Sequence, residues 1–320
     1  MWRMQQRYVG SSGLRVSRLA LGTMTWGRDT DEHESKDQLS AFLEAGGTFV
    51  DTAAGYGDGA AEELLGALLP ELARRDEVVI CTKAGISRST GERVVDTSRR
   101  ALLAALDGSL RRLGTDHVDL WLAHTWSDQV PLEETLSALE LAVASGRARY
   151  VGISNYNGWQ SARAATLTQV RGTTPLVATQ VEYSLVQRSV EGEVLESADA
   201  HGLGVMAWSP LGRGVLTGKY RTGTPADSRA ASPHFAEFVE RYLDERARRV
   251  VDALVTAADG LGCSPAELAL AWVRDRPGVV APIVGARTAA QLRGTLSSED
   301  VQLPPQIRDV LDEVSAPSPS

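Results

Sequence analysis

Residues 118–154, VDLWLAHTWSDQVPLEETLSALELAVASGRARYVGIS, contain the pattern that decides the fold. The apolar run Val118–Ala123 predicts a buried strand, and the later run Tyr150–Ile153 predicts a second one. Between them, apolar residues recur at helical spacing from Leu132 to Val143, after a proline suited to the first turn and before a glycine suited to the stop. The stretch therefore predicts a strand, a helix and a strand, which together form one βαβ unit.

The same pattern recurs along the whole chain. Eight apolar runs are followed by loops and by amphipathic helix patterns: Leu19–Gly22, Thr48–Thr52, Val78–Thr82, Val118–Ala123, Tyr150–Ile153, Leu176–Thr179, Val205–Trp208 and Val280–Val284. Runs that are apolar on both faces indicate parallel strands covered by helices on both sides. Eight such units, at a period of about thirty residues, predict an α/β fold of the closed (β/α)8 TIM barrel type.

We expect residues 1–314 to form a single barrel domain, with an N-terminal β-hairpin at Tyr8–Arg18 and extra helices near the C-terminus. The hairpin would plug the amino-terminal end of the barrel. The glycine-rich stretch Pro210–Pro233 predicts a long loop within one unit. Residues 315–320, SAPSPS, predict a disordered tail. An open doubly wound sheet is the alternative fold, but residues 22–27 lack the G-x-G-x-x-G fingerprint expected after its first strand.

Composition narrows the classes of partner. The 320 residues include 33 Lys and Arg against 41 Asp and Glu, which gives a net charge of −8. That charge repels nucleic acid and anionic lipid, so we expect neither as a partner. The two cysteines, Cys81 and Cys263, lack the spacing of a disulfide framework or a metal site, and we expect no metal. The cysteine content and the lack of an apolar targeting or membrane segment predict a cytoplasmic protein.

Polar residues follow the apolar runs at the end where barrel enzymes carry their active sites. A core-packing role does not predict such a bias. A single polar residue there would be interpreted as a helix cap or a solvated loop residue. The whole set predicts a site: Asp51, Lys83, His124, Ser154, Asn155, Gln180, Ser209 and Arg287.

The sequence resembles the aldo-keto reductase superfamily, in the branch that includes bacterial reductases and the β subunits of voltage-gated potassium channels. The resemblance runs from Tyr8 to Ser298, and the order and spacing of its motifs make it specific. The motifs are DTAAGYG at 51–57, TKAG at 82–85, LAH at 122–124, VGISN at 151–155 and WSPLGRG at 208–214. The resemblance implies NADPH-dependent reduction of an aldehyde or ketone, a small-molecule carbonyl substrate.

The family's catalytic tetrad resembles Asp51, Tyr56, Lys83 and His124. Chemistry gives an independent reason for these residues to converge, because a carbonyl oxygen that becomes an alkoxide needs a proton. Tyr56 would donate that proton, and a nearby Lys83 ammonium would lower the pKa of the phenol. Asp51 would hold Lys83 in place and keep it protonated. A neutral His124 would bind and orient the carbonyl oxygen, although a histidine in that position can also be a satisfied core residue.

The resemblance also implies an NADP(H) site. Trp208 would stack on the nicotinamide, whose carboxamide would bind Ser154, Asn155 and Gln180. A pyrophosphate loop and a segment for the adenosine 2′-phosphate complete the set: Ser209, Leu211, Gly212 and Gly214 in the first, Gly285, Arg287, Thr288 and Gln291 in the second. The sequence departs from the commoner family pattern at Gly294 and Thr295, where many relatives carry Glu-Asn, and at Gly285, where some carry lysine.

The substrate end is less defined. Trp26 and Trp126, with Tyr56, would line an aromatic pocket for an apolar or sugar-like carbonyl compound, but each tryptophan could equally pack at the barrel rim. Neither the substrate nor the oligomeric state follows from the sequence.

Two other functions fit parts of the pattern. The same site could belong to a cofactor-sensing subunit, as in the channel β subunits. An aldolase could use Lys83 as a Schiff-base nucleophile, but an adjacent Asp51 would keep that lysine protonated and poorly nucleophilic.

Overall fold

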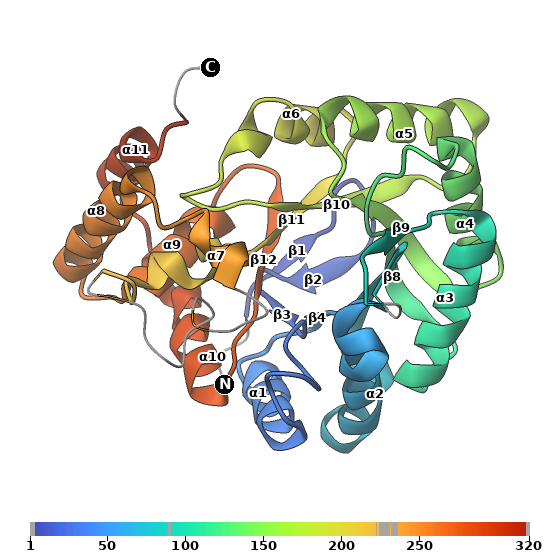
Figure 1. Ribbon diagram of the computed structural model, residues 1–320, viewed down its shortest axis with the longest axis horizontal. Coiled ribbons are helices and arrows are strands. Elements are labelled where there is room, and N and C mark those ends of the chain that lie inside the picture. The colour runs from blue at the N-terminus through green and yellow to red at the C-terminus, as the bar shows by residue number, and fades with distance from the viewer. Residues whose placement is uncertain (1–3, 89–90, 222, 224–230, 232–235, 318–320) are drawn as a thin grey trace.

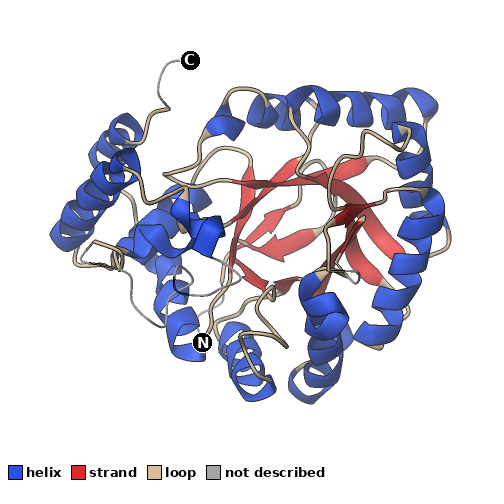
Figure 2. Cartoon of the chain, in the orientation of Figure 1, coloured by secondary structure: helices blue, strands red, loops and turns tan. Residues whose placement is uncertain are grey.

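The protein is an eight-stranded closed parallel barrel surrounded by helices, as a computed structural model describes it for residues 4–88, 91–221, 223, 231 and 236–317 (Figures 1 and 2). The barrel strands are β3 (Ala20–Gly22), β4 (Phe49–Asp51), β5 (Val79–Ala84), β8 (Val118–Ala123), β9 (Ala148–Ser154), β10 (Leu176–Glu182), β11 (Gly204–Trp208) and β12 (Val279–Val284). Pairing of β12 with β3 closes the ring. Each strand overlaps one of the eight apolar runs, so the predicted fold is confirmed.

Helices form the outer layer, shown in blue around the red strands in Figure 2. They are α1 (Glu32–Glu44), α2 (Ala60–Leu72), α3 (Arg99–Leu113), α4 (Leu132–Ala144), α5 (Gly158–Arg171), α6 (Val194–Ala200), α9 (Pro265–Arg274) and α10 (Ala289–Leu296). Three further helices, α7 (Ala236–Glu240), α8 (Glu245–Leu261) and α11 (Pro305–Val314), lie in the C-terminal third of the chain. Of these, α8 and α11 pack side by side at one edge of the molecule (Figure 1). They are extra helices near the C-terminus of the kind that the sequence predicts.

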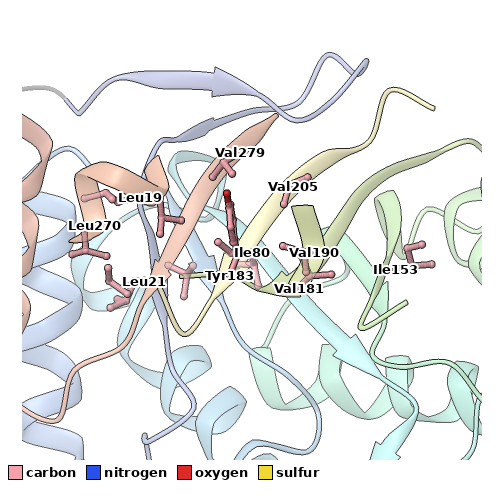
Figure 3. Close-up of a cluster of buried hydrophobic side chains, with 14 of the residues drawn as sticks. Leu19, Leu21, Ile80, Ile153, Val181, Tyr183, Val190, Val205, Leu270 and Val279 are labelled. Carbon is pink, nitrogen blue, oxygen red and sulfur yellow. The ribbon is translucent and has the colours of Figure 1, made fainter. Parts of the chain in front are cut away.

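The N-terminal hairpin pairs β1 (Gln6–Tyr8) with β2 (Arg15–Ser17) in antiparallel register. Val9 and Val16 are fully buried and belong to the same apolar cluster as Phe49 and Met206 of the barrel strands. The hairpin therefore plugs one end of the barrel, as predicted. A larger cluster of buried apolar residues includes Leu19, Ile80, Val205 and Leu270, which are labelled in Figure 3.

Two short strands follow β5 that the sequence does not predict. They are β6 (Ile86–Ser87) and β7 (Val94–Val95), which pair as a small antiparallel hairpin. After β11, the predicted loop Pro210–Pro233 begins with a short 3-10 segment, Gly212–Thr217. Its residues 222, 224–230, 232 and 233 lie outside the described residues.

The packed chain extends beyond the predicted start of the tail. Ser315 is fully buried, accepts a 2.8 Å hydrogen bond from Arg188 Nη1 and donates one to the carbonyl oxygen of Leu311. The proposed tail therefore begins after Ser315, and its residues 318–320 lie outside the described part of the chain. A single domain over residues 1–314 stays a prediction. In the described ranges, no helix combines the length and apolarity needed to cross a membrane.

Candidate active site

A cavity of about 670 Å³ opens at the carboxyl ends of the barrel strands. Asp51 from the end of β4, Gln180 from β10 and Trp208 from the end of β11 line it. Tyr56 and His124, from the loops after β4 and β8, complete its base. Residues from four separate strand–loop units, those of β4, β8, β10 and β11, thus line one cavity, as the strand-end pattern predicts.

Lys83 and Asp51 form a buried ion pair below this cavity. The Lys83 Nζ atom lies 2.9 and 2.8 Å from the two carboxylate oxygens and 2.6 Å from the carbonyl oxygen of Thr52. Burial, the largest influence, lowers the pKa of Lys83, but the charges of Asp51, Tyr56 and Cys81 and the hydrogen bond to Asp51 together outweigh it, so the pKa is raised overall. Lys83 is therefore a fixed cation, and it is a poor candidate for the nucleophilic amine of an aldolase.

Tyr56 lies directly above Lys83. Its Oη atom is 3.4 Å from Nζ, and the ammonium is 4.9 Å from the ring centroid. A sharp bend through Gly57, Asp58 and Gly59, all with positive φ, connects Tyr56 to α2. Loss of solvent raises the pKa of the Tyr56 phenol, although Lys83 acts in the opposite direction. The predicted net lowering of this pKa is therefore wrong, because burial outweighs the ammonium.

His124 packs edge-on against Tyr56, with ring centroids 6.1 Å apart and an interplanar angle of 78°. Its Nδ1 atom is buried and has no hydrogen-bond partner among the described residues. Burial, followed by the positive charges of Lys83, Arg93 and Arg88, lowers the pKa of His124 to about 3. The ring is therefore neutral near pH 7, as predicted.

A hydrogen-bond network connects the catalytic candidates to the predicted nicotinamide residues. Gln180 Nε2 donates to Asp51 Oδ1 at 2.8 Å, and Asn155 Nδ2 donates to the carbonyl oxygen of His124 at 2.9 Å. The Asn155 Oδ1 atom accepts a 3.0 Å hydrogen bond from Trp208 Nε1, which fixes the indole at the cavity wall. Ser154 is fully buried and donates to the carbonyl oxygen of Gln180, so it supports the wall from behind.

The loop after β11 turns repeatedly through the left-handed region. Ser209, Gly212, Arg213 and Gly214 have φ values of 52°, 53°, 60° and 95°. Ser209, Leu211 and Gly214 line the cavity, whereas Gly212 is buried, with Val186 2.5 Å from where its Cβ would lie. A Cβ at Gly214 would lie 3.3 Å from Lys219 Nζ. Lys219, which sequence reasoning missed, also lines the cavity and places a cation beside this loop.

Arg213 is a second residue that sequence reasoning missed. Its Nε and Nη2 atoms each donate a 2.8 Å hydrogen bond to the carboxylate of Glu182 at the end of β10. The guanidinium lies 5.6 Å from the ring of Trp208 and 5.2 Å from the ring of Tyr242. Glu182 is a carboxylate at the end of β10, a strand whose seven residues are all buried. This pair anchors the loop and supports the indole.

The last strand–loop unit contributes Gly285, Arg287 and Gln291 to the cavity wall. Thr288 instead caps α10, where its Oγ1 accepts a 3.2 Å hydrogen bond from the Gln291 amide. Gly294 and Thr295 also line the cavity. The two departures from the commoner family pattern thus lie where they affect the cavity directly.

The two predicted pocket tryptophans are not among the described residues that line the cavity. Trp26 is fully buried, and its Nε1 atom donates a 3.1 Å hydrogen bond to Gln38 of α1. Trp126 packs edge-on against Tyr156 and Trp159, each at 5.3 Å, outside the cavity wall. The structure favours rim packing for both, because the side chain after a strand can point away from the barrel axis as well as toward it.

Other residues take the place of the tryptophans. Met24, Thr25, Ile86 and Arg93 line the cavity. Within the described ranges, no group of three or more His, Cys, Asp or Glu side chains could hold a metal ion.

Comparison with known proteins gives consistent matches over nearly the whole chain. The model of the aldo/keto reductase family matches residues 18–316. The chain is 37% identical to the uncharacterised oxidoreductase YrpG of Bacillus subtilis (strain 168), over 97% of this chain and 96% of that protein. It is also 37% identical to a probable voltage-gated potassium channel subunit beta of Oryza sativa subsp. japonica, over 98% and 96%. The L-glyceraldehyde 3-phosphate reductase of Escherichia coli (strain K12) is 37% identical over 91% and 86%.

Proposed function

The chain belongs to the aldo/keto reductase family, and from that premise we propose that it reduces an aldehyde or ketone to an alcohol with NADPH. One observation carries the proposal. Lys83, fixed by Asp51, lies 3.4 Å from the Tyr56 hydroxyl, with a neutral His124 beside it at the base of a cavity. These are the groups that a carbonyl oxygen needs as it gains negative charge.

Tyr56 is the proton donor in this proposal. The high pKa of its phenol keeps the proton in place before the reaction, and the Lys83 ammonium stabilises the phenolate that remains afterwards. His124, neutral because its pKa is about 3, orients the carbonyl oxygen through a hydrogen bond without transferring a proton. Asp51 holds Lys83 in position through their ion pair, and Gln180 of the cavity wall holds Asp51 through a hydrogen bond.

The residues of the cavity fit a nicotinamide dinucleotide, which supplies the hydride when bound. The fixed indole of Trp208 offers a flat surface for the ring, and Asn155 and Gln180 offer polar edges. The loop that lines the cavity at Ser209, Leu211 and Gly214 turns through left-handed backbone conformations and has Lys219 beside it. We expect this loop to bind a pyrophosphate. Arg287, with Gln291 at the start of α10, is our candidate for recognition of the 2′-phosphate.

Ser154, Gly212 and Thr288 have supporting roles in this proposal. Ser154 braces Gln180, Gly212 allows the loop to turn, and Thr288 caps α10. Gly285 keeps its predicted place in the wall. A net charge of −8 supports a small-molecule substrate over nucleic acid, and a cytoplasmic location stays a prediction.

The direct test is a panel of aldehydes and ketones assayed by cofactor absorbance, with NADPH and NADH in separate reactions. We expect oxidation of NADPH that depends on the carbonyl compound and is faster than with NADH. No reduction of any compound in the panel by either cofactor would contradict the proposal.

A cofactor-sensing subunit is the second candidate function. The 37% identity to the Oryza protein, over nearly both whole chains, favours it. In that case, the purified protein would retain cofactor tightly, turn over too slowly for metabolism and copurify with a membrane or regulatory protein. Rapid turnover with free exchange of cofactor would instead favour the reductase.

A further inference from the structure

The small hairpin after β5 carries two arginines. Its register pairs Ile86 with Val95 and Ser87 with Val94. Continuing this register by one step would place Arg88 opposite Arg93, and both side chains are exposed. Like charges in directly opposite positions destabilise an antiparallel pair, unless an anion compensates them.

Neither guanidinium has such a compensating group in the described part of the chain. The hydrogen bonds and ion pairs between described residues include no side-chain contact for Arg88 or Arg93, although Glu92 is next in sequence to Arg93. Asp51 supplies the only carboxylate among the described residues that line the cavity, and Lys83 binds both of its oxygens. Among the described residues that line the cavity, no carboxylate is therefore left to pair with Arg93.

Arg93 lines the cavity together with Ile86, Tyr56 and His124. The charges of Arg93 and Arg88 both reach His124, where they help to lower its pKa. A molecule whose carbonyl group lies between Tyr56 and His124 can therefore extend along Ile86 toward Arg93.

The position of this hairpin in the ring separates it from the proposed phosphate loop. In the strand order β10, β11, β12, β3, β4, β5, β8, β9, the strands β5 and β11 lie directly across the barrel from each other. Lys219 and the left-handed loop follow β11, whereas Arg93 follows β5. The cofactor phosphates on one side would leave Arg93 on the other side for the substrate.

We propose that the substrate is an anionic carbonyl compound, an aldehyde or ketone that carries a carboxylate or phosphate group, and that Arg93 binds this group. The inference rests on the proposed reductase function and specifies its substrate class. Arginine suits this role because its planar guanidinium can bind either oxyanion through two parallel hydrogen bonds.

The test compares 4-formylbenzoate with its neutral methyl ester, two aldehydes that differ chiefly in charge. The kcat/KM of each is measured for the wild type, Arg93→Ala, Arg93→Lys and the control Arg171→Ala. Arg171 is an exposed arginine at the end of α5 and does not line the cavity, so its loss changes the net charge equally.

We expect the wild type to favour the carboxylate by about tenfold, which is the value of one charge-assisted hydrogen bond at a partly open site. Arg93→Ala should remove this preference by raising KM for the carboxylate, with little change for the ester. Arg93→Lys should retain part of it, and Arg171→Ala should retain all of it. Equal kcat/KM values in the wild type, or an unchanged preference in Arg93→Ala, would overturn the inference.

Binding of the unreactive dianion terephthalate, followed by tryptophan fluorescence, tests the anion site without turnover. Binding that weakens about tenfold in Arg93→Ala, but not in Arg171→Ala, would support the site even if neither aldehyde were reduced. Equal binding by the wild type and Arg93→Ala would overturn it. Failure of the carbonyl panel would contradict the reductase function separately.

Discussion

Individual residues around the proposed reaction point differ in how burial and charge set their protonation. Burial raises the pKa of Tyr56 and lowers that of His124 to about 3, whereas at Lys83 the charges of Asp51, Tyr56 and Cys81 and the hydrogen bond to Asp51 together outweigh it. The result is a phenol, a neutral imidazole and an ammonium at the same pH. This combination suits donation of a proton to a carbonyl oxygen.

The pH dependence of reduction should follow from these directions. Tyr56 must be protonated, and its pKa lies above the ordinary value of about 10, so kcat/KM should stay level from about pH 6 to 9 and fall only above about pH 10. His124 should add no step, because its pKa is about 3 rather than the ordinary value of about 6.5. A pH profile of kcat/KM checks both. A rise or fall centred near pH 6.5 would contradict the neutral histidine.

The preference between cofactors should depend on Arg287. We expect Arg287→Ala to weaken NADPH binding by about ten- to hundredfold and to leave NADH binding nearly unchanged, because a 2′-phosphate is present only in NADPH. Arg293→Ala is the matched control, since Arg293 is an exposed arginine of the same helix, α10, and does not line the cavity. Titration of both variants with both cofactors is the measurement. If Arg287→Ala kept the full preference, another group would recognise the phosphate.

Strand ends and the family resemblance together predicted much of the site from the sequence. Asp51, Lys83 and His124 were found because each lies at or just beyond the end of an apolar run, whereas Tyr56 was found from the resemblance, and the structure brings the four together. The direction of the pKa shift of Tyr56 could not be predicted from the sequence, because it depends on how much solvent the surrounding loops exclude from the phenol. The sequence could not decide between pocket lining and rim packing for Trp26, because the orientation of its side chain involves Gln38 in a different element.

At the scale of elements, α2, β5 and α3 are joined by one buried carboxylate. Glu62 is fully buried and accepts hydrogen bonds from Thr82 Oγ1 at 2.5 Å and from Arg112 Nε and Nη2 at 2.9 and 2.6 Å. Thr82 is next to Lys83 in β5. The contact therefore fixes the strand that carries the proposed catalytic lysine.

Removal of this carboxylate should destabilise the fold. We expect Glu62→Ala to lower the free energy of unfolding by about 3 kcal/mol, because Arg112 loses its partner and a buried space opens. Glu63→Ala should change it by about 0.5 kcal/mol or less, since Glu63 is exposed in the same first helical turn. Urea denaturation of both variants gives the comparison. Equal midpoints would show that the buried pair contributes little.

Elements with strong periodicity were predictable, and short ones were not. The eight barrel strands each follow from an apolar run, whereas β6 and β7 are two residues long and show no alternation that distinguishes them from a loop. The start of the C-terminal tail was also misjudged. The Ser-Pro composition of residues 315–320 predicts a tail, but Ser315 is buried by Arg188, which lies 127 residues away in sequence.

At the scale of the whole molecule, the closed barrel arranges the loops that follow successive strands in a ring at one face. Strands β4, β5 and β8 are neighbours in the ring, so the tetrad comes from consecutive units. Strands β11 and β12, on the other side, carry the loops that we assign to the cofactor. The period of the apolar runs was sufficient to predict this arrangement, because a closed barrel of eight βα units places every carboxyl end at one face.

The most direct test of the account is the rate of carbonyl reduction by Tyr56→Phe, measured together with its affinity for NADPH. The variant loses the proton donor and keeps the ring, so kcat/KM should fall by about 10²–10⁴-fold while NADPH binding stays within about twofold of the wild type. Tyr156→Phe, which removes the same atom from a buried tyrosine that does not line the cavity, should reduce carbonyls at nearly the wild-type rate. Near-normal reduction by Tyr56→Phe would contradict the account, because the proton would then come from another group.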